Sequence, residues 1–157
     1  MKPQPSPIDP EGIFDGLRWG SIFLGAIVDI GVTAVASIPL VLWYAGPEAF
    51  SLDEEVADRA LNVVYASWEF LIASAAVGLA ATAYGAYFGA RRAGAHYLRH
   101  GGWVAVVSAL IGFGVLLIPG IATESAPPAW FEALSMGLML PAGVLGGFVA
   151  FKREAAA

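Results

Sequence analysis

The chain contains, at residues 19–44, the stretch WGSIFLGAIVDIGVTAVASIPLVLWY, in which Asp29 is the only charged residue. A helix needs roughly 20 mainly apolar residues to cross about 30 Å of hydrocarbon, so this stretch is long enough to span a membrane. Three further stretches meet the same requirement, at residues 61–90, 103–122 and 130–151. The sequence therefore predicts an all-α fold in which four transmembrane helices form a bundle.

The composition of the whole chain supports this prediction. Of 157 residues, 58% are hydrophobic and only 13% are charged, whereas soluble domains average about 45–50% and about 25%. No ten-residue window alternates with period two, so a transmembrane β-barrel is not expected. The absence of cysteine excludes disulfide frameworks, thiolate metal sites and cysteine nucleophiles. An ordinary soluble domain is thus excluded, and the net charge of -5 argues against nucleic-acid binding.

The chain divides into a tail and one membrane domain. Residues 1–15 contain four prolines and predict an irregular cytoplasmic tail, while residues 16–157 form a single four-span domain. The alternative is a cleavable signal peptide, because residues 34–36, Ala-Val-Ala, imitate a cleavage site after an apolar run. The leader is acidic at Asp9, Glu11 and Asp15, which is the wrong charge for the start of a signal peptide.

The basic residues predict how the chain is oriented. Seven of the eight lie on one side of the predicted spans, and only Arg59 lies on the other. These seven are Lys2, Arg18, Arg91, Arg92, Arg99, Lys152 and Arg153. Because cytoplasmic loops carry the excess of Lys and Arg, both termini are expected in the cytoplasm, with the acidic loops outside. We expect a multi-pass protein of the bacterial inner membrane.

Local signals predict where the helices begin and break. The stretch Ser51-Leu52-Asp53-Glu54 has the form of a capping box, so the second helix is expected to start outside the membrane near Leu52. Pro127 and Pro128 predict the start of the fourth helix. Gly94 and the pair Gly101–Gly102 predict a break between the second and third helices.

Asp29 is the most informative single residue. It follows Arg18 by 11 residues, roughly 16 Å of helix, which places it near the middle of the bilayer. An aspartate there costs roughly 2.5–3.5 kcal/mol and must face protein or water. No Lys or Arg lies within a predicted span, so we expect a neutral acid bonded to a hydroxyl such as Thr82 or Ser108, with Thr33 one turn away. The favoured interpretation is a hydrogen bond between helices; the alternative is a proton or cation relay.

Small residues predict where the helices pack closely. Without a hydrophobic drive in lipid, small side chains let helix backbones approach one another. Such residues lie on the first, second and fourth predicted helices: Gly25, Ser74, Gly78, Gly85, Gly89, Gly143 and Gly147. We favour ordinary packing within the bundle over a functional pore.

The basic segment between the second and third spans is expected to contact lipid. Arg91, Arg92 and Arg99 suit anionic lipid head groups. His96 and His100 are four residues apart and could share a helical face, but a third metal ligand is missing nearby. We therefore expect neither a metal site nor a bound cofactor, haem included.

Catalytic patterns are absent from the sequence. There is no G-x-S-x-G, no H-E-x-x-H and no Walker loop. An intramembrane aspartate protease needs two acids at one depth, and Glu69 is expected near the outer interface, far from Asp29. The chain is therefore not expected to be an enzyme.

A weak internal similarity suggests two related helical hairpins. Residues 85–92 align without a gap on residues 146–153, and Arg18 aligns with Arg99. The chain also resembles a group of uncharacterised bacterial four-span membrane proteins. The residues that carry this resemblance are Trp19, Gly20, Gly25, Ala26, Gly85, Gly89, Ala90, Arg91, Ala93, His100, Gly143, Gly146 and Gly147. The resemblance implies a fold and a membrane location, and no activity.

Three functional hypotheses follow. The first is a non-catalytic helix-packing protein that serves as an accessory or assembly subunit, either as a homo-oligomer or within a larger membrane complex. The alternative is a small proton, ion or solute transporter that uses Asp29 with Thr33. A third is a lipid-interacting protein that uses the basic turn.

Overall fold

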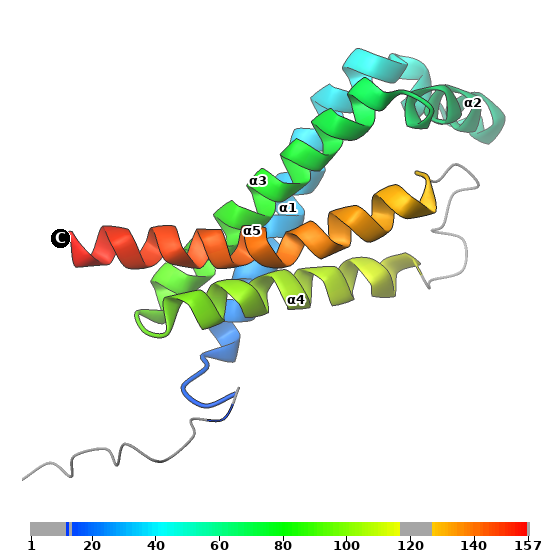
Figure 1. Ribbon diagram of the computed structural model, residues 1–157. Helices are drawn as coiled ribbons and strands as arrows, with labels where there is room; N and C mark the ends of the chain where they lie inside the picture. Colours follow the sequence, from blue (N-terminus) through cyan, green and yellow to red (C-terminus); the bar gives the residue numbers. More distant parts are fainter. Residues whose placement is uncertain (1–11, 13, 117–126, 157) are drawn as a thin grey trace, which may run out of the picture.

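The computed structural model describes residues 12, 14–116 and 127–156, and these residues form helices without any strand. Figure 1 shows the elements in order. They are α1 (Trp19–Ala45), η1 (Pro47–Phe50), α2 (Glu54–Tyr65), α3 (Trp68–Ala93), α4 (Tyr97–Leu116) and α5 (Ala129–Ala155). Four of them, α1, α3, α4 and α5, are long and apolar enough to cross a bilayer. The chain is a multi-pass, all-α membrane protein, which confirms the predicted fold class.

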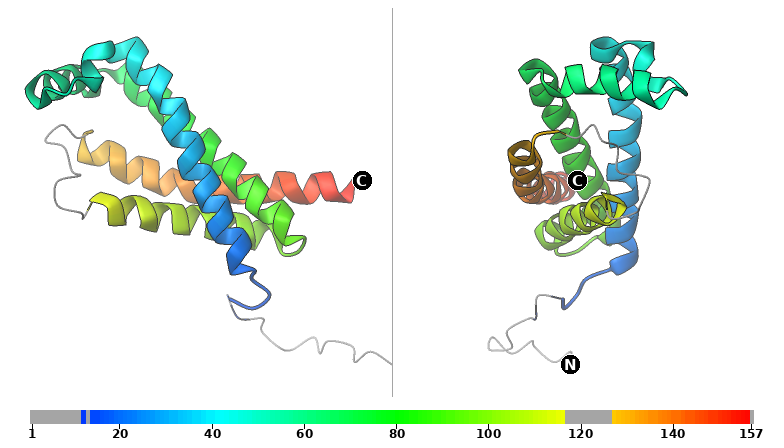
Figure 2. Two further views of the ribbon diagram at one scale, coloured as in Figure 1. Left: turned by 180° about the vertical axis from the view of Figure 1, so that it is seen from behind. Right: turned by 90° about the vertical axis from the view of Figure 1, so that its right-hand side faces the viewer.

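The four long helices pack as two pairs. Helix α1 lies beside α3, and α4 lies beside α5, and the first pair crosses the second obliquely (Figures 1 and 2). Helix α3 is central because it contacts α1, α4 and α5. The core where the pairs meet consists of Ile22, Ala26, Ala86, Val104 and Val107.

One end of the bundle gathers four helix ends. The start of α1, the end of α3, the start of α4 and the end of α5 lie toward the same side, and α2 projects at the opposite end (Figure 1). The basic residues of the described chain lie at this gathered end, apart from Arg59 on α2. The fold thus collects the positive charge that the sequence distributes over three segments.

The prediction of a single second helix is wrong. The chain breaks at Ala66 and Ser67, which separates the short α2 from the membrane helix α3. Ser67 begins the new helix, because its hydroxyl accepts a hydrogen bond from the Phe70 amide at 3.3 Å. Helix α2 is capped by Asp53, whose Oδ1 accepts from Glu55 N at 3.1 Å and Val56 N at 3.4 Å. It therefore begins at Glu54, two residues after the predicted start.

The expected break at Gly101–Gly102 is also wrong, because both residues lie inside α4. The break predicted at Gly94 is confirmed, because Gly94 ends α3 in the left-handed conformation with φ 67°. The predicted third span extends to residue 122, and its part beyond Leu116 lies outside the described residues. Helices α1 and α5 match their predicted spans to within a few residues, and Pro128 precedes α5 as expected.

Aromatic side chains cluster at both ends of the bundle. At the gathered end, Trp103 packs on Phe14 at 5.2 Å and on Trp19 at 5.7 Å between ring centroids. At the other end, Trp68 of α3 meets Trp130 of α5 at 5.3 Å. Aromatic rings favour the level of the lipid head groups, so these clusters mark where the helices leave the hydrocarbon.

Candidate functional site

Asp29 joins two helices through hydroxyl groups. Thr82 of α3 donates a hydrogen bond to Asp29 Oδ1 at 3.2 Å, and Thr33, one turn along α1, donates to the same oxygen at 3.5 Å. Asp29 is only 2% exposed and Thr82 is equally buried. The hydroxyl expected opposite the acid is therefore present, and it comes from the helix that packs against α1.

A third hydroxyl faces the same carboxyl from α4. Ser108 lies within interaction range of Asp29, and its side chain is 3% exposed. Within the described part of the chain, Ser108 Oγ and Asp29 Oδ2 are both buried without a hydrogen-bond partner. The Ser108 hydroxyl can donate or accept a hydrogen bond, and Asp29 Oδ2 accepts one, or donates one when it carries the proton. The site thus brings together polar groups from α1, α3 and α4.

The buried face of α1 ends at Asp29. The buried residues of this helix are Ser21, Ile22, Gly25, Ala26 and Asp29. Beyond Asp29, Thr33 and Ala36 are half-buried and Val32 is exposed. The side of α1 that carries Asp29 is therefore buried before the acid and only partly buried after it.

Glycines bring α1 and α3 into backbone contact. A Cβ atom placed on Gly85 would lie 2.6 Å from Gly25 O and 2.7 Å from Asp29 Cβ. One added to Gly89 would lie 2.9 Å from Ser21 O. Even a methyl group at these positions would require the helices to move apart, so the three glycines set the distance at which Thr82 reaches Asp29.

The same kind of contact holds α5 against its neighbours. A Cβ on Gly143 would lie 2.6 Å from Gly101 O of α4, and Gly147 abuts the carbonyl of Tyr97. Gly146 faces α3 instead, where an added Cβ would lie 2.9 Å from the Tyr87 amide nitrogen. Sequence reasoning did not single out Gly101 or Gly146 for packing, although the position of Gly146 between Gly143 and Gly147 is a signal that could have found it.

Two of the predicted packing residues make no such contact. A Cβ on Gly78 would have no atom of the described residues within 4 Å. Ser74 donates its hydroxyl to Leu71 O of its own helix at 3.0 Å. Among the predicted packing residues of α3, Gly85 and Gly89 are therefore the ones that make close contacts within the described chain.

His100 has a structural role that the sequence did not reveal. Its ring is completely buried, and Nε2 accepts a hydrogen bond from the Arg18 amide at 2.9 Å. Nδ1 lies 3.1 Å from the carbonyl of His96, so the proton belongs on Nδ1. The imidazole thus ties the start of α1 to the start of α4, and His96 lies before α4 rather than on a shared face.

The three arginines of the basic turn have different surroundings. Arg91 and Arg92 are exposed at the end of α3, whereas Arg99 is half-buried. The guanidinium of Arg99 donates to the backbone carbonyl of Asp15 at 3.3 Å. Arg99 therefore holds the segment before α1, and it is not simply a lipid-facing cation.

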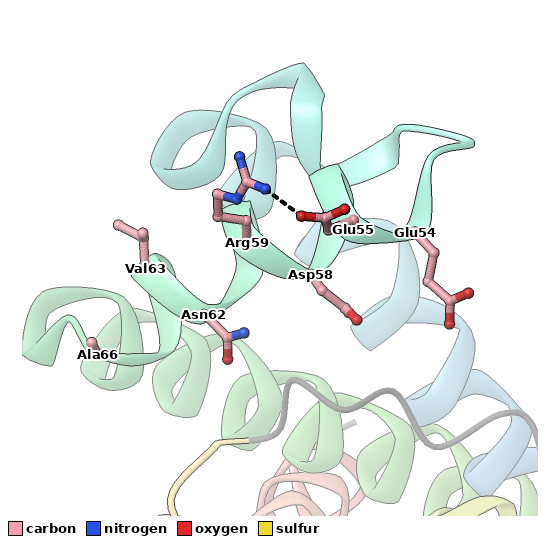
Figure 3. A pocket seen from close by; sticks show the side chains of 7 residues that line it. All are labelled: Glu54, Glu55, Asp58, Arg59, Asn62, Val63 and Ala66. Carbon is pink, nitrogen blue, oxygen red and sulfur yellow. Dashed lines mark hydrogen bonds and ion pairs between the residues drawn. The ribbon is translucent and has the colours of Figure 1, made fainter.

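Helix α2 carries the acidic surface of the opposite end. Figure 3 shows Arg59 turned toward Glu55, with Glu54 and Asp58 directed elsewhere along the helix. Arg59 and Glu55 form an exposed ion pair at 2.7 Å. Among the described residues, no three histidine or acidic side chains converge as metal ligands. At the end of α2, burial and the charge of Glu132 raise the pKa of Tyr65.

Comparison of the chain with protein-family models, curated proteins and solved structures gave no match. The resemblance to bacterial four-span membrane proteins therefore stays a prediction.

Proposed function

We propose that this membrane protein is a non-catalytic accessory or assembly protein of the bacterial inner membrane, with both termini in the cytoplasm. The observation that carries the proposal is that the central polar site is buried and its acid is hydrogen-bonded within the chain. Asp29 is bonded by hydroxyls of its own chain and is 2% exposed. A buried acid held in this way joins helices and offers no surface to a substrate.

The packing of the bundle supports the same function. Its interior contacts are backbone approaches at glycines, while large apolar side chains such as Phe23, Ile27 and Val35 of α1 point outward. Outward apolar faces suit either lipid or the helices of partner subunits. We therefore propose that the chain works as a homo-oligomer or as a subunit of a larger membrane assembly.

Proton or ion transport through Asp29 is the second candidate. It is favoured by one observation, the buried pair of Asp29 Oδ2 and Ser108 Oγ, which lack hydrogen-bond partners among the described residues. Buried polar atoms that are free to take up or pass on a proton beside an intramembrane acid are what a proton relay would use.

The variant Asp29→Asn separates the two candidates, because it keeps the shape and one oxygen of the side chain but cannot release a proton. The accessory function predicts that the purified variant retains the oligomeric mass of the wild type by native mass spectrometry. It also predicts equal, background-level proton uptake for both proteins in liposomes under a pH gradient. Proton uptake by the wild type that Asp29→Asn abolishes would establish transport instead.

A further inference from the structure

Two arginines from different helices converge on one tyrosine. Arg91 of α3 donates a hydrogen bond to the Tyr87 hydroxyl at 3.1 Å, and Arg153 of α5 donates to the same oxygen at 3.4 Å. The guanidinium carbon of Arg153 also lies 5.5 Å from the centre of the Tyr87 ring. The arginines are therefore positioned by a neutral group.

This pair of cations has no carboxylate partner among the described residues. Within the described parts of the chain, neither Arg91 nor Arg153 forms an ion pair with a carboxylate. Each guanidinium has five N–H donors and uses one on Tyr87, while the hydroxyl of Tyr87 keeps its own proton to donate. Two positive charges with spare donors at one point are complementary to an anion, and phosphate is an anion whose geometry arginine matches well.

An apolar groove leads away from these arginines into the membrane span. It lies between α3 and α5 and has a volume of about 310 Å³. The residues that line it are Ala83, Tyr84, Tyr87, Leu145, Gly146, Val149 and Arg153. Gly146 forms its floor, because the absence of a side chain there lets α5 lie directly against Ala83 and Tyr87 of α3.

The groove and the arginines match the two parts of a phospholipid, which are its acyl chain and its phosphate. From Ala83 to Arg91, α3 rises about 12 Å. The groove therefore begins within the apolar part of α3 and leads toward the last turns of α3 and α5, where Arg91 and Arg153 lie. A soluble anion would use only the arginines and would leave the apolar groove empty. A phospholipid would fill both parts at once.

We propose that this groove binds one anionic glycerophospholipid, with an acyl chain along Ala83, Leu145 and Val149 and the phosphate between Arg91 and Arg153. The site differs from the basic turn as a whole, since Arg99 is engaged with Asp15, and Arg91, unlike Arg92, is hydrogen-bonded to Tyr87 of the groove. The inference is independent of the proposed accessory function, because either a scaffold or a transporter can hold a lipid there.

Native mass spectrometry of the detergent-purified protein, titrated with phosphatidylglycerol, tests the proposal. Phosphatidylcholine with the same acyl chains serves as the neutral comparison. We expect the first phosphatidylglycerol to bind more tightly than phosphatidylcholine, and the double variant Arg91→Gln/Arg153→Gln to weaken it by about tenfold or more. Excess inorganic phosphate is expected to leave lipid binding unchanged.

A second double variant provides the matched control. Arg92→Gln/Lys152→Gln removes the same charge from the same two helix ends, but neither residue is hydrogen-bonded to Tyr87 or lines the groove. It should change the affinity by less than about threefold. Val149→Trp fills the groove without any change of charge, and it should also weaken the binding of phosphatidylglycerol. This last variant keeps the test decisive if the arginine double variant misfolds.

Several results would overturn the proposal. Equal affinity for the two lipids would show that the phosphate and its charge are not recognised. Equal losses in the two double variants would show only a general attraction to a basic surface. Unchanged binding in Val149→Trp would exclude the groove, and competition by inorganic phosphate would indicate a site for a soluble anion.

Discussion

At the scale of the residue, Asp29 is held by hydroxyl groups and not by a base. Placing an aspartate at the bilayer centre costs roughly 2.5–3.5 kcal/mol. Hydrogen bonds between membrane helices contribute about 0.6 kcal/mol each on average, with a maximum near about 1.7 kcal/mol. The bond from Thr82, which is the one that joins two helices, therefore offsets only part of that cost. The remainder must come from the packing around the acid or from neutralisation of its charge.

Removal of the Thr82 hydroxyl should measurably weaken the bundle. Thr82→Val keeps the volume but loses the donor to Asp29 Oδ1, so the free energy of unfolding should fall by about 0.6–1.7 kcal/mol. Equilibrium unfolding in mixed micelles measures this difference. Ser74→Ala is the control, because the Ser74 hydroxyl bonds to its own helix and its loss should cost less. Equal effects of the two variants would contradict an interhelical role for Thr82.

The Arg18 amide should depend on the acceptor that His100 provides. His100→Phe fills the same space without an acceptor, so hydrogen exchange of the peptide that contains residues 12–20 should accelerate by about tenfold or more. His100→Gln retains a carbonyl oxygen that can accept this hydrogen bond, and its exchange should stay closer to the wild type. Slow exchange in His100→Phe would show that the aromatic contacts of Phe14 and Trp103 hold this segment without the hydrogen bond.

At the scale of the element, hydropathy predicted the membrane helices well and local signals predicted their ends less well. Helix α1 was predicted closely because its apolar run is bounded by Arg18 and Gly46. The break before α3 has neither glycine nor proline, and it depends on Ser67 capping a helix that changes direction. The start of α4 was placed too late because Gly101 has low helix propensity. Tertiary contact with Gly143 overrides that propensity.

The candidate sites divide in the same way. Its distance from Arg18 placed Asp29 at mid-bilayer depth, and the cost of an acid there predicted a hydroxyl partner such as Thr82 or Ser108. The role of His100 could not be read from the sequence, because it depends on the contact between the starts of α1 and α4. The convergence of Arg91 and Arg153 on Tyr87 likewise requires the crossing of α3 and α5. Sequence patterns predict which side chains share one face of a helix. The contacts between side chains of different helices are seen only in the packed structure.

Glycine substitutions should separate packed positions from open ones on a single helix. Gly85→Ala places a methyl group 2.6 Å from Gly25 O, so overpacking should lower the free energy of unfolding by about 1–3 kcal/mol. Gly78→Ala meets open space and should be neutral or slightly stabilising, since alanine favours helix over glycine. Thermal unfolding in detergent compares the two variants. A larger loss for Gly78→Ala would indicate that this face of α3 packs against another copy or a partner.

At the scale of the whole molecule, the gathered end is the basic end, and side chains there connect three segments of the chain. His100 and Arg99 attach the segment before α1 to the α3–α4 turn, and Tyr97 packs on Phe151 at 6.1 Å between ring centroids. The opposite end carries α2 and its acidic residues instead. The two ends of the bundle therefore differ in charge, with the basic residues at the gathered end and most of the acidic residues of the described chain at the end that carries α2. Such a distribution suits a single orientation in the bilayer.

Single-cysteine labelling tests that orientation directly, because the chain contains no cysteine of its own. Ala95→Cys lies in the α3–α4 turn, Ala156→Cys follows α5, and Leu52→Cys is fully exposed before α2. If the basic end faces the cytoplasm, an impermeant maleimide should modify Leu52→Cys in intact spheroplasts but reach the other two only after permeabilisation. The reverse pattern would place the basic end outside, against the excess of Lys and Arg that governs insertion. Labelling of Ala95→Cys and Leu52→Cys from the same side would mean that α3 does not cross the bilayer, and the four-span topology would then be wrong.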